Sequence, residues 1–165
     1  KSTGEVMGIA NNFPGAYAKT QAAVDMELPK TGTCFLSVCD RDKRAILPLA
    51  RDLARMGFKL ICTSGTARAL ESANIPCEVI GRVSDPEPNI ATLIGEGKID
   101  LMINTPFGQE TRSDGYVLRT LAVRQNLCYV TTLAGAQAFV SAIDNLRDDN
   151  LPIIALQDLD QWEEK

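Results

Sequence analysis

The feature that most constrains the fold of this chain is a regular alternation of short apolar runs with segments of helical periodicity. The expected strands are 33–39, 58–62, 77–80, 99–103 and 128–130. The expected helices are 12–25, 41–56, 66–73, 90–96, 115–125 and 134–145. Strands and helices that alternate at this spacing form a mainly parallel sheet with helices on both faces. The sequence therefore predicts an α/β protein with a mainly parallel, five-stranded sheet.

Length and charge limit the classes of protein to which the chain can belong. It has 165 residues, enough for one domain with its own core, and a net charge of −4 at pH 7. It has neither the apolar run of roughly 20 residues that a membrane helix needs nor a basic stripe for nucleic acid. It begins without Met or a signal-peptide pattern, so we interpret it as a segment of a longer chain. We expect no membrane and no nucleic acid among its partners.

The cysteines and the absence of histidine limit the chemistry. The five cysteines are Cys34, Cys39, Cys62, Cys77 and Cys128. Their odd number and the absence of a CxxC spacing argue against a disulfide framework and against a zinc site. We expect buried free thiols in a cytoplasmic protein. Without histidine, any chemistry would have to use carboxylates, Lys or Arg, and we expect no metal site.

The stretch 63–66, Thr-Ser-Gly-Thr, directly follows an expected strand and opens an expected helix. A helix N-terminus presents unpaired N–H groups and the positive end of the helix dipole. Gly65 allows an anion to approach the backbone, and the hydroxyls of Thr63, Ser64 and Thr66 add donors. One interpretation is a phosphate-binding site. The other is that Thr and Ser only cap the helix, and the spacing alone does not decide between them.

Further polar residues follow other expected strands. Lys43 follows the first strand, Arg82 the third, and Asn104 the fourth. Parallel strands end at one edge of the sheet, where ligands of such folds bind, so we expect these residues to meet the 63–66 stretch. Taken alone, Lys43 or Arg82 is more simply explained as a solvated surface charge. Asn104 suits a sugar hydroxyl or a base edge, whereas Pro106 and Gly108 in the same loop favour a plain turn.

Two acidic positions have a structural and a functional interpretation. Ser113 and Asp114 precede the helix expected at 115–125, where N-capping is the default role and ligand contact the alternative. Glu87 lies in the proline-bounded loop 84–88. It is either a solvated acid of a surface turn or a base acting on a sugar phosphate.

Five stretches of the chain resemble a known family. SVCDRDK, CTSGT, GEGKIDLMINTPFG and YVTTLAGA resemble the methylglyoxal-synthase-like domain at the C-terminus of carbamoyl-phosphate synthase large chains. The opening KSTGEVMGIANNFPGAYAKTQ resembles the junction that closes the second ATP-using half of those chains. The resemblance runs from residue 1 to about residue 145.

The resemblance implies an α/β/α sandwich of three layers, with a junction over 1–31 and a regulatory domain over 32–165. It implies a parent ligase, glutamine-hydrolysing carbamoyl-phosphate synthase, which uses ATP with Mg or Mn and serves pyrimidine and arginine biosynthesis. The domain itself is implied to perform no chemistry and to bind a nucleotide effector, UMP or IMP, that changes the affinity of distant ATP sites. The other implied partners are the rest of the large chain, the small glutaminase chain, ornithine and further copies of the protein.

The resemblance also assigns roles to individual positions. It places Lys43, Thr63 and Thr66 on the nucleotide phosphate, with Arg82 where a Lys is common. Together with the helix-opening stretch, the expected phosphate-binding residues are Lys43, Thr63, Ser64, Gly65, Thr66 and Arg82. The expected ribose and base side consists of Asn104, Thr105 and Asp114.

The chain departs from the family at several positions. Pro106 stands where some relatives have a second Thr, and Gly115 stands where some have Ser. Tyr129 and Thr131 match positions that contact ornithine, while Val130 replaces an acid between them. The resemblance therefore implies phosphate binding more directly than ornithine binding.

Two other functions compete with a regulatory domain. One is a lyase of the methylglyoxal synthase type acting on dihydroxyacetone phosphate, because Glu87 falls near the position of that enzyme's catalytic acid. The histidines of that enzyme's pocket are absent from this chain. The other is a structural domain that mediates contacts between copies of the large chain.

Overall fold

The structure is a computed structural model that describes residues 5–105, 109–148, 153–155 and 157–158. At its centre lies a parallel sheet in the strand order β3-β2-β1-β4-β5. The strands are β1 Thr33–Val38, β2 Lys59–Cys62, β3 Glu78–Val79, β4 Leu101–Thr105 and β5 Cys128–Val130. The predicted five-stranded parallel sheet is confirmed.

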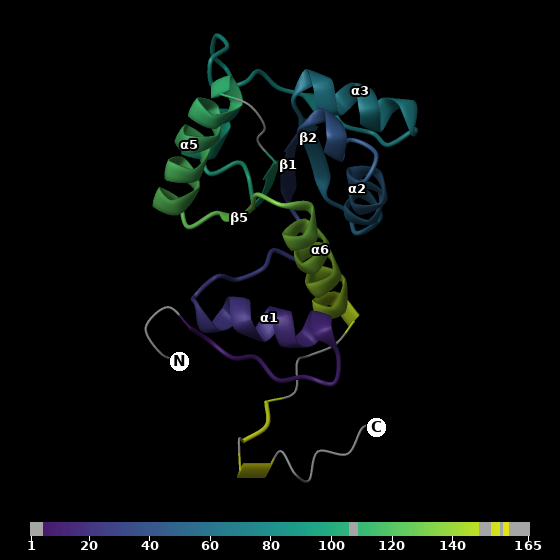
Figure 1. Ribbon diagram of the computed structural model, residues 1–165, viewed down its shortest axis with the longest axis vertical. Helices are drawn as coiled ribbons and strands as arrows, with labels where there is room; N and C mark the ends of the chain where they lie inside the picture. The colour runs from purple at the N-terminus through teal and green to yellow at the C-terminus, as the bar shows by residue number, and fades with distance from the viewer. Residues whose placement is uncertain (1–4, 106–108, 149–152, 156, 159–165) are drawn as a thin grey trace.

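Helices cover both faces of this sheet (Figure 1). They are α1 Phe13–Ala23, α2 Ile46–Arg55, α3 Ser64–Ser72, α4 Ile90–Gly95, α5 Gln109–Arg124 and α6 Leu133–Asp148, with a short 3₁₀ turn, η1, at Asp40–Asp42. Helices α2, α3 and α6 share one core cluster with the sheet, and α4 and α5 share the other. Helix α1 packs on α6. The predicted α/β/α layering is confirmed.

The alternation of side chains along β1 shows why both faces need helices. Cys34 and Leu36 belong to the core on the α2, α3 and α6 side, while Phe35 belongs to the core under α4 and α5. Every residue of β4 is buried. Apolar runs without a polar face are typical of parallel sheets covered on both sides. The short edge strand β3 has both of its residues exposed, and short edges resist pairing with other chains.

The prediction of a helix over 41–56 is wrong about where that helix begins. Residues 40–42 form η1, and α2 begins only at Ile46. The cause is Pro48, which has no N–H and is tolerated only in the first turn of a helix. The helix must therefore begin just before this proline, and Lys43 is left on the turn between β1 and α2.

The helix expected at 115–125 also begins earlier than predicted. Helix α5 starts at Gln109, so Ser113 and Asp114 lie inside it and are not its N-caps. Gly115 costs a helix roughly 1 kcal/mol relative to Ala. Here it is buried, and the packing of α5 on α4 and β5 supports the helix through this glycine.

All five cysteines are free, as predicted. Cys34, Cys62 and Cys128 are buried, while Cys39 and Cys77 are half-buried. Burial raises the pKa of the Cys128 thiol to about 11. A thiol with such a pKa stays protonated near neutral pH, so it packs as a small apolar side chain.

No helix in the described part of the chain is long and apolar enough to cross a membrane. Residues 146–148 form the last turn of α6, and the described residues 153–155 and 157–158 form no strand. Pro106 and Gly108 lie outside the described residues. The division of the chain at residues 31 and 32 stays a prediction.

Candidate functional site

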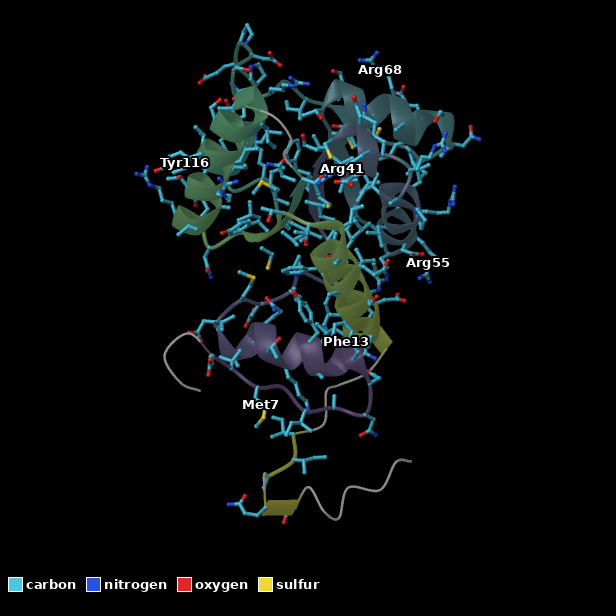
Figure 2. The ribbon with its side chains drawn as sticks, viewed as in Figure 1. Met7, Phe13, Arg41, Arg55, Arg68 and Tyr116 are labelled. Atoms are coloured by element: carbon cyan, nitrogen blue, oxygen red, sulfur yellow. The ribbon has the colours of Figure 1, made fainter. Side chains whose placement is uncertain are left out.

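A pocket of about 500 Å³ lies at the carboxyl edge of the sheet, between the start of α3 and the start of α5. Its lining includes eight residues predicted as ligand contacts: Lys43, Thr63, Gly65, Thr66, Arg82, Asn104, Thr105 and Asp114. Figure 2 labels Arg41, another lining residue, between α5 and α3 in the view. The fold thus brings residues separated by more than 70 positions in the sequence into one pocket.

The first turn of α3 forms one wall of the pocket. Thr63 is the N-cap residue, but its side chain makes no capping hydrogen bond. Its hydroxyl donates instead to Ser37 Oγ, at 3.3 Å. The interpretation of Thr63 as a mere cap is therefore wrong. The N–H groups that open this helix have no side-chain cap, and the positive end of the helix dipole faces the pocket.

Lys43 extends over this uncapped helix start. Its Nζ lies 3.4 Å from the point that a Cβ on Gly65 would occupy. Gly65 has no backbone φ that requires glycine, so the absence of a side chain here leaves room beside the ammonium. An ammonium and a helix N-terminus both attract negative charge. The space between them suits an anion.

Buried hydroxyls surround this space. Thr66 is 1% exposed, and its Oγ1 accepts a hydrogen bond from the backbone N of Val38 at 3.0 Å. Because that bond uses a lone pair, the hydroxyl proton of Thr66 stays available to an acceptor in the pocket. The hydroxyl of Thr105 is used differently, since it accepts from the backbone N of Cys39 at 3.2 Å and also donates to Cys39 Sγ at 3.8 Å. Thr105 therefore holds the end of β1 in place.

Arg82 approaches the pocket from the loop after β3. Its backbone N donates to Asp85 Oδ2 at 2.7 Å, which fixes the turn. Its side chain is exposed and forms no ion pair with another residue in the described ranges. A guanidinium in this position is available to an anionic ligand, and its planar fork matches two oxygens of a phosphate.

The opposite wall of the pocket is apolar. It consists of Phe35, Val83, Ile90 and Leu118, with Gly115 beside them. Such a wall suits a flat ring, because ligand sites combine apolar walls with few polar groups.

Asn104 and Asp114 add polar groups to the part of the pocket away from α3. Asn104 is 5% exposed, and its side-chain amide makes no hydrogen bond to another described residue. Its donors and acceptor are therefore open to a molecule in the pocket. Asp114 lines the pocket from inside α5, five residues after Gln109, the first residue of that helix.

Four predicted residues lie outside this pocket. Ser64 is exposed on the outer side of the α3 start. Tyr129 packs against the core under α4 and α5, and Thr131 is half-buried just after β5. Glu87 is exposed in its loop. The pocket therefore contains no carboxylate from the 84–88 loop.

Several lining residues were not predicted from the sequence as ligand contacts, among them Ser37, Cys39 and Asp40. The signal that indicates them is their position, because all three lie at the carboxyl end of β1 or just after it. Asp40 Oδ1 lies 2.5 Å from Lys43 Nζ. The Lys43 ammonium holds the pKa of Asp40 below its ordinary value, chiefly through this hydrogen bond.

Comparison with known proteins gives the family. A family model described as the MGS-like domain matches residues 45–131, more than half of the chain. This segment includes most of the pocket residues.

Curated relatives carry a more specific name. A protein of Methanopyrus kandleri named "Carbamoyl phosphate synthase large chain, C-terminal section" is 49% identical over 160 residues, covering 96% of this chain and 30% of that protein. One of the same name from Methanocaldococcus jannaschii is 42% identical over 161 residues, covering 97% and 26%. The carbamoyl phosphate synthase large chain of Corynebacterium glutamicum is 46% identical over 167 residues, covering 97% and 15%. This chain thus spans less than a third of the length of each relative, and it belongs to the MGS-like domain family, in the form found at the C-terminus of carbamoyl phosphate synthase large chains.

Proposed function

We propose that this chain is the effector-binding domain of a carbamoyl phosphate synthase large chain and that its pocket binds a nucleoside monophosphate of the UMP or IMP type. The observation that carries the proposal is the uncapped start of α3 with the Lys43 ammonium above Gly65. Helix N-termini that are open in this way bind phosphate groups.

The rest of the pocket supports a nucleotide in preference to free phosphate. A phosphate at the α3 start has the Thr66 hydroxyl and Arg82 within the same pocket. The apolar wall around Phe35 and Leu118 provides a face for the base, and the buried amide of Asn104 suits a sugar hydroxyl or base edge. The volume of about 500 Å³ falls within the range of about 300–1,000 Å³ that is usual for small-molecule sites.

In the parent protein, this binding would regulate the synthesis of carbamoyl phosphate for pyrimidine and arginine biosynthesis. Regulation requires a coupling free energy between the pocket and the ATP sites, typically about 1–3 kcal/mol. The names of the relatives support a parent carbamoyl phosphate synthase. Its use of ATP with Mg or Mn and its association with a small glutaminase chain are further parts of the proposal. We also propose that the domain contributes to contacts between copies of the parent large chain.

Ornithine is a separate proposal, because Tyr129 and Thr131 lie outside the nucleotide pocket. The lyase alternative has no observation in its favour. Glu87 lies outside the pocket lining, and the chain contains no histidine to act with it.

The proposal is tested by calorimetric titration of the chain with UMP, IMP, UTP, uridine and inorganic phosphate. We expect a nucleotide to bind, uridine to bind much more weakly, and Lys43→Ala to weaken nucleotide binding by about tenfold. Lys59→Ala is a control of matched charge, because Lys59 pairs with Glu78 at the other end of β2 and does not line the pocket. No nucleotide binding by the folded chain, or equal weakening by both variants, would reject the proposal.

A further inference from the structure

In the turn between β1 and α2, the ammonium of Lys43 already forms an ion pair with the Asp40 carboxylate. Asp40 Oδ1 lies 2.5 Å from Lys43 Nζ, and both residues line the pocket. The Asp40 side chain is 94% exposed, whereas the Lys43 side chain is 29% exposed. The cation is therefore held in the pocket by a carboxylate that projects into water.

This pair has a different setting from the other ion pairs of the molecule. Lys43 Nζ lies against the start of α3, 3.4 Å from the Cβ position of Gly65. A cation at a helix N-terminus is repelled by the helix dipole, so it needs a neighbouring negative charge to stay there. The lowered pKa of Asp40, caused first by its hydrogen bond with Lys43, agrees with this mutual stabilisation.

A phosphate bound at the α3 start would contact the same ammonium. Phosphate and the Asp40 carboxylate would then lie within a few ångströms of each other, and like charges at that distance repel. Asp40 has room to move away, since its side chain is almost fully exposed. On binding, the phosphate of the ligand therefore replaces the Asp40 carboxylate as the ion-pair partner of Lys43.

We propose that Asp40 is an internal counter-ion of the effector site: it keeps Lys43 above Gly65 in the ligand-free protein and lowers the affinity for phosphate-bearing ligands by competing for Lys43. This inference rests on the proposed function. It makes Asp40 a positioning residue that sets affinity, in contrast to Thr66 and Arg82, which offer only donors to the ligand. A phosphate-free nucleoside does not compete with Asp40.

The test compares UMP and uridine on four forms of the chain by calorimetric titration: wild type, Asp40→Asn, Asp40→Glu and Asp52→Asn. Asp52 is the matched control, because it also forms an i,i+3 ion pair, with Arg55 at 3.8 Å, and lies outside the pocket lining. We expect Asp40→Asn to bind UMP about three- to tenfold more tightly than wild type. Uridine binding should not change, and Asp40→Glu and Asp52→Asn should stay within about twofold of wild type for UMP.

The outcomes separate this inference from the proposed function. If wild type binds UMP and Asp40→Asn binds it equally or more weakly, the counter-ion role is rejected and the effector site stands. Tighter uridine binding by Asp40→Asn would also reject the role, because the effect would not act through phosphate. If neither form binds UMP, both proposals fall.

Discussion

The starts of α3 and α4 differ in how they satisfy their first N–H groups. Both helices follow a strand at the carboxyl edge of the sheet. At α4, Asn89 Oδ1 accepts from the backbone N of Ala91 at 2.9 Å and of Thr92 at 3.3 Å. At α3, Thr63 provides no side-chain cap, and Lys43 lies over the opening.

The difference shows that the unpaired N–H groups of a helix start can serve either stability or ligand binding. Orphan N–H groups at a helix start must be satisfied by a side chain, water or a ligand. Where Asn89 closes the helix start, the hydrogen bonds contribute to stability and nothing is left for a ligand. Where the start is open inside a pocket, the same groups are available to an anion. The predictions below test this contrast.

The largest expected effect is a loss of stability on replacing Asn89 by Ala. Besides capping α4, Asn89 donates from Nδ2 to the carbonyl oxygens of Val83 and Asp85, so four hydrogen bonds disappear. We expect the free energy of unfolding to fall by about 2–3 kcal/mol, measured by urea denaturation. Asn12→Ala, which removes a single cap bond to Gly15 N, should cost about 1 kcal/mol or less. Equal costs for the two variants would contradict this account.

Gly65→Ala should separate binding from stability. A Cβ at Gly65 meets only Lys43 Nζ at 3.4 Å and Cε at 3.9 Å, so the fold accommodates it, and Ala favours a helix by up to about 1 kcal/mol over Gly. The methyl group would occupy the space proposed for the phosphate. We therefore expect a melting temperature equal to or above that of wild type, with UMP affinity lower by about tenfold or more.

The matched control for this variant is Gly95→Ala, at the end of α4. A Cβ there meets nothing within 4 Å. It should leave UMP affinity unchanged in the same titration. Undiminished binding by Gly65→Ala would show that the phosphate does not lie at the α3 start.

Thr66→Ala should affect both properties. Thr66 is almost fully buried, and its loss leaves the backbone N–H of Val38 without its partner. We expect a loss of about 1–2 kcal/mol in the free energy of unfolding together with weaker UMP binding. Thr66→Ser, which keeps the hydroxyl, should restore most of both. A fully stable Thr66→Ala variant would argue against the bond to Val38.

The smallest effect is expected for Thr63→Ala. Because its hydroxyl does not cap α3 and makes only long bonds, to Ser37 Oγ at 3.3 Å and to Thr66 Oγ1 at 3.5 Å, its removal should cost less than about 1 kcal/mol. Chemical denaturation of this variant beside Asn89→Ala gives the comparison directly. A cost as large as that of Asn89→Ala would mean that Thr63 caps α3 after all.

Much of the fold was predictable because it depends on periodicity. The apolar runs of β1, β2 and β4 are buried on both faces, which leaves a clear signal in the sequence. The boundaries were less predictable. The start of α2 depends on one proline, and α5 passes through Gly115, which local propensity disfavours.

The site was predictable to the extent that it follows from topology. Lys43, Arg82 and Asn104 meet because parallel strands end at one edge, and this is visible in the order of strands and polar residues. The missing cap at Thr63 and the ion pair between Asp40 and Lys43 depend on side-chain rotamers, which spacing does not specify. The contrast between the two helix starts therefore required the structure.

The most direct test of the central claim is a ¹H–¹⁵N NMR titration of the chain with UMP that follows the amides at the two helix starts. The account predicts that the Gly65 amide signal shifts on saturation, because its N–H group donates to the bound phosphate. Those of Ala91 and Thr92 should stay in place, because Asn89 already accepts from them. If UMP binds while the Gly65 amide does not shift, or if no signal responds at all, the α3 start is not the effector site.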